Sequence, residues 1–325
     1  MENLIISSHL HVIYKWPEIQ SALHPGERSS DRPDLCARVF KLKLDSLMDD
    51  LMKKDVLGKV IAHNMTIEWQ KRGLTHAHIL LIMHGADKPR TPELIDKIVS
   101  AELPDKTKNP RLFDVVSSNM IHGPCGNMNL NCSCMKGEGL ERKCSKNFPM
   151  SESINTFIPH DSFTKYQRRL PANGGESFAR NGFQVDNSWV VPHNPFLLLK
   201  YNAHVNFEVV HSVQAVKYLY KYINKGPDRI MVSVTEEEPQ ERNEVQEFVN
   251  ARYISASEAF WRLYEFPIHS IYPPVDKLPL HLPGEQSILF QDGEAGAALE
   301  RGPPGTKLTA YFQLNQDASQ QICCY

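Results

Sequence analysis

The chain has 325 residues, of which 41% are hydrophobic and 23% are charged, so its length allows two domains or one elaborated core. Its 36 lysines and arginines stand against 38 aspartates and glutamates, a net charge of −2, which excludes a nucleic-acid binder that relies on bulk positive charge but not a local basic groove. The apolar runs are too short to span a bilayer, and the first residues lack the pattern of a secretory signal. We therefore expect a soluble protein that is not secreted.

Apolar spacing, turn residues and prolines predict the elements along the chain. The predicted helices cover residues 34–54, 91–102, 212–225 and 255–266. The predicted strands cover residues 60–69, 76–83, 189–206 and 207–210, and residues 171–182 are predicted to be a loop. The strands at 60–69 and 76–83 are separated by a short turn with a glycine, which is typical of an antiparallel pair.

The segment 119–149 contains four of the seven cysteines. In a chain without a secretory signal, such clustering indicates a metal site rather than a disulfide framework. The predicted ligands of a structural zinc ion are His122, Cys125, Cys134 and Cys144, with Cys132 as a competing ligand. A solvated basic loop with unligated thiols is the alternative.

His76 and His78 lie within the strand predicted at 76–83. Because side chains alternate faces along a strand, both imidazoles point the same way and can bind one divalent cation. Glu68 and Gln70 share one face of the preceding strand, and either can supply a third ligand. Three protein ligands leave positions open for substrate, as a catalytic metal requires. The alternative is a chance pair among fourteen histidines.

Tyr218 and Tyr222 lie one turn apart on the helix predicted at 212–225, opposite its apolar stripe. Lys221 and Lys225 lie close to the same side. A bound cation beside a scissile phosphate would polarise it and let a tyrosine hydroxyl attack, which gives a covalent phosphotyrosine. A packing face between elements is the alternative for this helix.

The stretch from Glu68 to Leu81 (EWQKRGLTHAHILL) resembles the histidine motif of the N-terminal Rep-type HUH endonuclease domain of eukaryotic Helitron transposases, also called the Helitron helicase-like domain. The stretch from Lys217 to Gly226 resembles the two-tyrosine motif of that family. Further similarities extend over most of the chain, as in His122-Gly123-Pro124-Cys125-Gly126, Asn194-Pro195-Phe196-Leu197-Leu198 and Tyr264-Glu265-Phe266-Pro267.

The resemblance implies an α+β HUH fold, in which an antiparallel sheet carries the histidines, flanking helices pack beside it and a cysteine-rich zinc insertion is added. It implies His76 and His78 as ligands of Mg²⁺ or Mn²⁺, with Glu68 or Gln70 completing the site, and Tyr218 and Tyr222 as nucleophiles. The implied activity is nicking and strand transfer on single-stranded DNA in rolling-circle transposition, a form of DNA recombination. The implied location is the nucleus.

The expected organisation has four parts. Residues 1–118 and 151–233 form the two halves of the endonuclease core, residues 119–150 form the zinc insertion, and residues 234–325 form an accessory region. The expected DNA contacts are the basic residues Lys71, Arg72, Lys221 and Lys225. The helicase domain of full-length family members is not expected in this chain, and the string from Gly302 to Lys307 lacks phosphate-loop spacing, so neither ATPase nor helicase activity is expected.

One departure from the family lies at residues 7–15 (SSHLHVIYK), where the family has a strand rich in Phe and Thr. We therefore expect part of the sheet or of the DNA contact to be compromised. Two other functions stay open. This departure and the missing helicase favour a catalytically inactive DNA-binding remnant of a transposon, and His76 and His78 with bound water could instead serve a metal-dependent phosphodiesterase that forms no covalent intermediate.

Overall fold

The computed structural model describes residues 5–69, 75–126, 128–137, 142–159, 164–210, 254–274, 278, 280–283, 285–286 and 305–316. The chain divides into two compact units, Met1–Pro273 and Pro274–Tyr325. Helix α10 (Lys307–Gln316) belongs to the second unit. The first unit contains the sheet and the candidate site.

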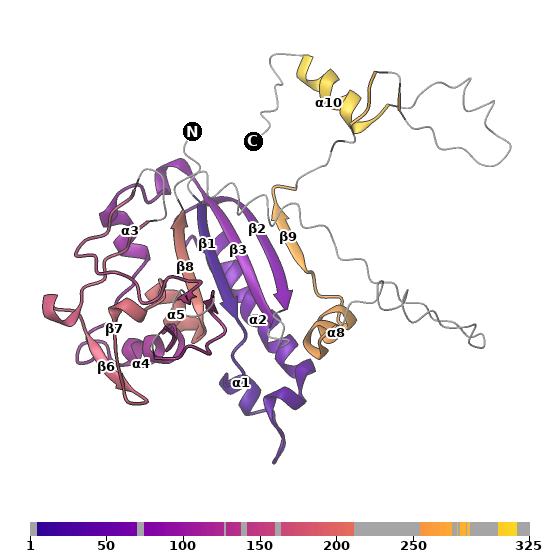
Figure 1. The fold of residues 1–325 in the computed structure, drawn as a ribbon. Coiled ribbons are helices and arrows are strands. Elements are labelled where there is room, and N and C mark those ends of the chain that lie inside the picture. The colour runs from indigo at the N-terminus through magenta and orange to yellow at the C-terminus, as the bar shows by residue number, and fades with distance from the viewer. Residues whose placement is uncertain are drawn as a thin grey trace. The chain divides into compact units, whose positions relative to one another are not determined.

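The first unit is built on a five-stranded antiparallel sheet (Figure 1). In spatial order its strands are β8 (Val205–Val210), β1 (Ile5–His11), β3 (Thr75–Met83), β2 (Val60–Trp69) and β9 (His269–Tyr272). The predicted pair of strands at 60–69 and 76–83 is confirmed as β2 and β3, which begin to pair at Trp69 and Thr75. Together with the helices, this sheet confirms a mixed α+β class.

The helices of the first unit are α1 (Pro17–Gln20), α2 (Pro33–Met52), α3 (Pro92–Ile98), α4 (Pro110–Asn119), α5 (Pro195–Tyr201) and α8 (Ala256–Leu263). Strand β4 (Met135–Lys136) pairs antiparallel with β5 (Lys143–Cys144), and a small hairpin joins β6 (Ser177–Arg180) to β7 (Phe183–Asp186). Among the described residues, no helix has both the length and the apolar character that crossing a bilayer requires. The helix predicted at 212–225 lies outside the described residues.

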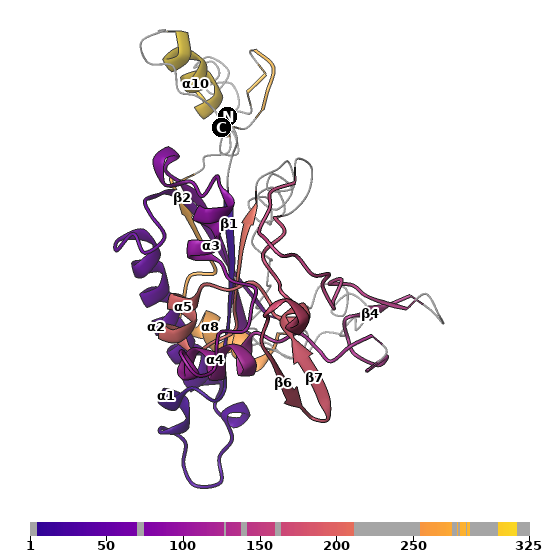
Figure 2. The ribbon, with the colours of Figure 1, turned by 90° about the vertical axis from the view of Figure 1, so that its left-hand side faces the viewer.

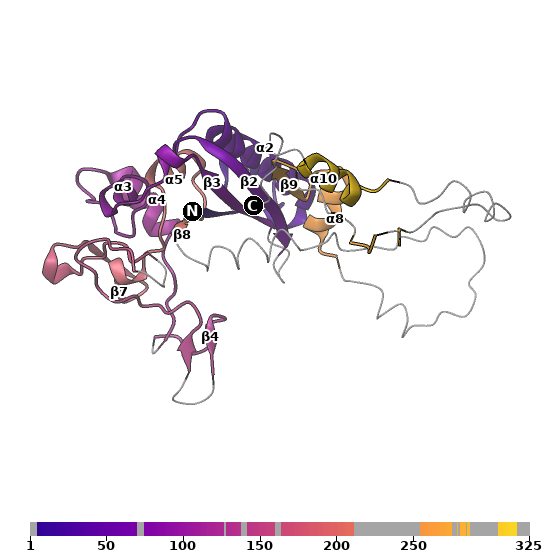
Figure 3. The same cartoon turned by 90° about the horizontal axis from the view of Figure 1, so that it is seen from above.

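The two faces of the sheet differ in chemistry because the side chains of β3 alternate. Ala77, Ile79 and Leu81 are fully buried in the main core. The long helix α2 covers this face and adds Phe40, whose ring lies 5.8 Å from that of Trp261 on α8. His76 and His78 occupy the opposite face, and the segments with β4 and the β6–β7 hairpin lie on that side of the sheet (Figures 2 and 3).

Strand β1 contains residues 7–11 of the segment in which the sequence departs from the family. Residues 7–11 pair with β3 on one side, from Ser7–Leu80 to His11–His76, and β1 also pairs with β8 on its other side. Leu10 is fully buried in the main core. The expectation that the departure at residues 7–15 compromises the sheet is therefore wrong, because alternation of Leu10 with polar neighbours suffices to place the strand.

The prediction of strand over residues 189–206 is wrong in its middle, where α5 forms instead. Asn194 caps this helix, since its side-chain oxygen accepts the N–H of Leu197 at 2.9 Å, and Pro195 occupies the first helical position. Asn202 ends the helix in the left-handed conformation, at φ 43°. The dipeptide Asn194-Pro195 indicates the start of a helix, but the apolar run after it led to the prediction of a strand.

Two other predicted elements differ in extent. Helix α3 ends at Ile98 rather than 102, because Ser100 exchanges two backbone hydrogen bonds with His193 and leaves the helix path. The predicted loop at 171–182 contains strand β6, and its turn residues Asn181 and Gly182 both have positive φ, as a two-residue hairpin requires. The Asn-Gly pair is a hairpin signal that the sequence reading missed.

Asp50 on α2 links that helix to α5 through charged hydrogen bonds. Its carboxylate is 1% exposed and lies 2.5 Å from Lys200 Nζ and 2.5 Å from the Tyr201 hydroxyl, which donates to it. Burial by itself would raise the pKa of Asp50, but the hydrogen bonds from Lys200, Tyr201 and Lys54 outweigh it and hold this pKa below its usual value.

Replacing Asp50 with asparagine is expected to destabilise the protein by about 2 kcal/mol at neutral pH. The cost stays moderate because the Lys200 side chain is 37% exposed and can reach water. Since the folded-state pKa is lowered, the contribution of the charge is present above the unfolded pKa and is lost as the pH falls below about 4. Urea unfolding at pH 7 and at acid pH checks this, with Asp49→Asn, whose partner Lys53 is 79% exposed, as the control. Equal stability of the two variants at pH 7 would contradict it.

Candidate metal centres

A row of polar side chains crosses the sheet on the face opposite α2. His78 on β3 pairs with Thr66 on β2 and with His9 on β1, and the next row pairs His76 with Glu68 and with His11. Directly paired residues of antiparallel strands project to the same face. The register therefore gathers imidazoles and a carboxylate at one end of the β1–β3–β2 ribbon.

Glu68, His76 and His78 form the first candidate metal centre. Their ligand atoms lie within 4.8 Å of one another. Glu68 Oε2 lies 3.1 Å from His78 Nε2 and 3.4 Å from His76 Nε2, and the two Nε2 atoms are 2.8 Å apart. Two imidazole nitrogens and one carboxylate oxygen fit a divalent cation with open positions. The side chains are 9%, 12% and 22% exposed for His76, His78 and Glu68, so the group is enclosed but reachable from one side.

Three further histidines surround this group, and the sequence reading missed their role. The ring of His9 lies 4.2 Å from that of His78, and the ring of His11 stacks on that of His76 at 5.1 Å. His204 lies 4.9 Å from His11. Burial, and then the neighbouring imidazoles, lower the pKa of His9 to about 3 and that of His11 to about 2. The alternation His-Leu-His within residues 9–11 was the available signal.

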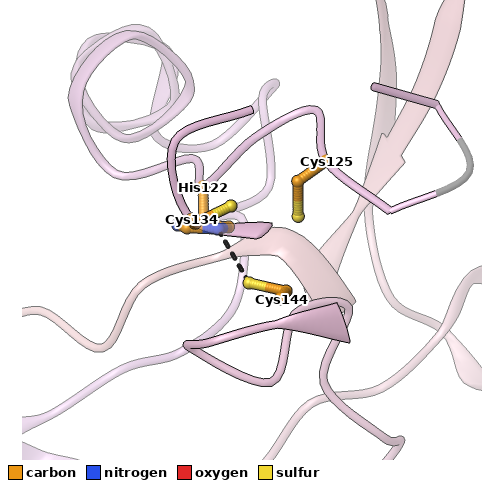
Figure 4. A group of neighbouring side chains, drawn as sticks. All are labelled: His122, Cys125, Cys134 and Cys144. Atoms are coloured by element: carbon orange, nitrogen blue, oxygen red, sulfur yellow. Dashed lines mark hydrogen bonds between the residues drawn. The ribbon is translucent and has the colours of Figure 1, made fainter. Parts of the chain in front are cut away.

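His122, Cys125, Cys134 and Cys144 form the second candidate metal centre, as predicted from the clustered cysteines (Figure 4). Their ligand atoms also lie within 4.8 Å of one another, and Cys144 Sγ lies 3.4 Å from His122 Nε2. One imidazole and three sulfurs are the donor set of a closed structural zinc site. Cys132 Sγ lies 3.5 Å from Cys134 Sγ, so it stays a competing ligand.

The ionisation of the thiols depends on their surroundings. Burial raises the pKa of Cys125 to about 11 and raises that of Cys134 as well. Burial opposes ionisation of Cys144 too, but the backbone N–H of Lys146, which donates to its sulfur at 3.3 Å, helps to bring the pKa of Cys144 below its usual value. A cation bound to this cluster would replace the thiol protons.

The cysteine segment is joined to the polar face of the sheet. Asn119, at the end of α4, accepts a hydrogen bond on its carbonyl from His204 Nδ1 at 2.6 Å, and the N–H of His122 donates to the Trp189 carbonyl at 2.9 Å. The ring of His122 stacks on that of Phe148 at 4.3 Å. The two candidate centres therefore share one side of the sheet and are connected through residues 119–122.

The other predicted site residues lie outside the described residues. These are the third-ligand candidate Gln70, the basic residues Lys71 and Arg72, the tyrosines Tyr218 and Tyr222, and the lysines Lys221 and Lys225. Of the two candidates for the third ligand, the described structure thus places Glu68 beside the histidines.

Comparison with known proteins identifies one family. Residues 14–81 match the family model described as the Helitron helicase-like domain at the N-terminus. The match begins after β1, spans α1, α2 and β2, and ends within β3, so it includes Glu68, His76 and His78. No curated protein matches the chain. Over residues 14–81 the chain is therefore similar to the Helitron helicase-like N-terminal domain.

Proposed function

We propose that this chain is a Rep-type HUH endonuclease of the Helitron type that nicks single-stranded DNA and transfers the strand through a 5′-phosphotyrosine. The observation that carries the proposal is the convergence of Glu68, His76 and His78 on one face of an antiparallel sheet. The family match includes these three residues and supports a nucleic acid as the substrate.

In this proposal, Glu68, His76 and His78 would hold Mg²⁺ or Mn²⁺. When bound, such a cation supplies polarisation of a phosphoryl oxygen and orientation of the leaving group. The three side chains come from two adjacent strands, so the sheet fixes their mutual geometry before substrate arrives. Glu68 Oε2 lies within 3.4 Å of the Nε2 atoms of both imidazoles, so the three ligand atoms are directed toward a common point.

Tyr218 and Tyr222 are the proposed nucleophiles. The phenol attacks the phosphorus atom, the bond to the 3′ oxygen of the neighbouring nucleotide breaks, and that oxygen leaves with a proton as a free hydroxyl. The phosphotyrosine retains a phosphodiester bond, so a second hydroxyl can displace the tyrosine and reseal a strand. Lys71, Arg72, Lys221 and Lys225 are the proposed contacts to the phosphate backbone.

The cysteine cluster is proposed to hold a structural Zn²⁺ that orders the insertion at 119–150. A helicase domain, as in full-length members of the family, is the proposed functional partner, and the nucleus is the proposed location. The proposed organisation keeps the core halves at 1–118 and 151–233 and the accessory region at 234–325.

The test is incubation of the protein with labelled single-stranded DNA and Mn²⁺, followed by denaturing electrophoresis. We expect a protein–DNA adduct that resists SDS, and its complete loss when Tyr218→Phe and Tyr222→Phe are combined. An adduct that survives the double substitution would refute the nucleophiles. Tyr264→Phe, a tyrosine at the end of α8, is the matched control and should leave the adduct intact.

Two other outcomes would identify the other functions. Cleaved DNA without an adduct would indicate a metal-dependent phosphodiesterase. Salt-sensitive binding of single-stranded DNA without cleavage would indicate an inactive DNA-binding remnant.

A further inference from the structure

Strand β1 places an additional imidazole at the candidate catalytic metal centre. His9 is directly paired with His78, and their ring centroids are 4.2 Å apart, closer than the 4.7 Å between His76 and His78, which belong to the cluster itself. The residues of the family match begin at 14, so this imidazole belongs to a part of the chain outside the match.

We propose that His9 is a further protein ligand of the cation bound by Glu68, His76 and His78, which makes the centre selective for Mn²⁺ and later transition metals over Mg²⁺. This inference rests on the proposed function, because it concerns the same cation. It adds a ligand and a metal preference that the histidine motif alone does not contain.

The geometry allows this ligand without movement of the strands. Directly paired residues in an antiparallel ladder have Cβ atoms about 4.5–5.5 Å apart. Two imidazoles whose nitrogens each lie about 2.0–2.1 Å from one ion can come from side chains at that spacing. The rings of His9 and His78 are inclined at 69°, and His9 is outside the group of ligand atoms that lie within 4.8 Å of one another. In this proposal the His9 side chain therefore rotates to bring a nitrogen to the shared ion.

In this proposal His11 has a different role from His9 and does not bind the ion. Its ring lies nearly parallel to that of His76, at 9°, and also contacts His204, whose Nδ1 is tied to the Asn119 carbonyl. Stacked rings support each other's orientation but do not converge on one point. We therefore assign His11 to the support of His76 and His9 to the ion.

The metal preference follows from the donor set. Imidazole nitrogen favours the first-row transition metals, most strongly the later ones and least strongly Mn²⁺, whereas Mg²⁺ binds oxygen ligands in an octahedral shell and keeps several waters. A centre with three imidazoles and one carboxylate therefore gains affinity for Mn²⁺ relative to one with two imidazoles, and gains little for Mg²⁺.

The test uses the full chain with one equivalent of zinc, which the thiolate site takes, and with excess zinc removed, so that the histidine centre is free for Mn²⁺. Mn²⁺ and Mg²⁺ affinities are measured by calorimetry, and pulsed EPR of bound Mn²⁺ reports the directly bound nitrogens. For His9→Gln we expect a loss of about tenfold or more in Mn²⁺ affinity, a smaller change for Mg²⁺, and one fewer nitrogen coupling. The exposed His24→Gln is the control and should match the unchanged protein.

Unchanged Mn²⁺ affinity and nitrogen couplings in His9→Gln would overturn the inference. His76→Ala separates this failure from that of the proposed function, since it should abolish Mn²⁺ binding in either case. If His76→Ala also binds Mn²⁺ normally, the proposed catalytic centre itself fails. Thermal unfolding of the metal-free variants checks folding, and His9→Thr, which suits a strand, replaces His9→Gln if the latter does not fold.

Discussion

Replacing His78 with alanine is expected to lower the rate of metal-dependent nicking by about a thousandfold or more, because several kcal/mol of transition-state stabilisation depend on the bound cation. His78 contacts both other members of the centre. Its Nε2 lies 3.1 Å from Glu68 and 2.8 Å from His76, and its ring contacts that of His9. Its removal therefore takes away one ligand and unsettles the other side chains.

The measurement is the single-turnover rate of adduct formation at a series of Mn²⁺ concentrations. A weakened ligand set predicts that high Mn²⁺ partly restores the rate of His78→Ala, whereas a misfolded protein would not respond to the metal. His63→Ala is the matched control, since His63 lies on neighbouring β2, hydrogen-bonds Ser270 at 3.0 Å and is outside the cluster. A full nicking rate in His78→Ala would rule out the proposed catalytic centre.

Replacing Cys144 with serine is expected to abolish zinc binding and to unfold the cysteine segment while leaving the sheet folded. Cys144 is buried together with Cys125, Met135, Val185 and Trp189 in a small cluster apart from the main core. The strands β4 and β5 have two residues each, so hydrogen bonds and apolar burial contribute little there. A structural zinc ion contributes about 10–16 kcal/mol of apparent binding free energy in zinc-finger peptides, enough to hold such a segment.

Metal content and limited trypsin digestion measure this effect. We expect one zinc per chain in the unchanged protein, none in Cys144→Ser, and rapid cleavage of the variant near Lys136, Lys143 and Lys146. Cys36→Ser is the control for loss of a buried thiol, because Cys36 lies on α2 and donates to the Ser29 carbonyl at 3.3 Å, away from the cluster. Cys132→Ser tests the competing ligand. Zinc retained in Cys144→Ser but lost in Cys132→Ser would reassign the site to Cys132.

Local signals in the chain accounted for much of the fold. Alternation predicted β2 and β3 and placed His76 and His78 on one face, and Thr91 marked the start of α3 as its cap. Each of these features depends on residues within a few positions of one another. The incorrect predictions arose where a helix or turn signal stood beside a stronger pattern, as at Asn194-Pro195 before an apolar run.

Contacts between segments that are far apart along the chain could not be predicted from such local signals. His9 and His78 are paired across the sheet although they are far apart along the chain, and His204 reaches the same face from β8's side. Local sequence patterns predicted the pair of strand histidines, the set of candidate zinc ligands and the α+β class. The position of β1 between β3 and β8 depends on the folded sheet, and it places His9 and His11 beside the candidate metal centre. The physical reason is that strand alternation sets which face a side chain takes, whereas the pairing of strands depends on burial of the whole sheet against α2.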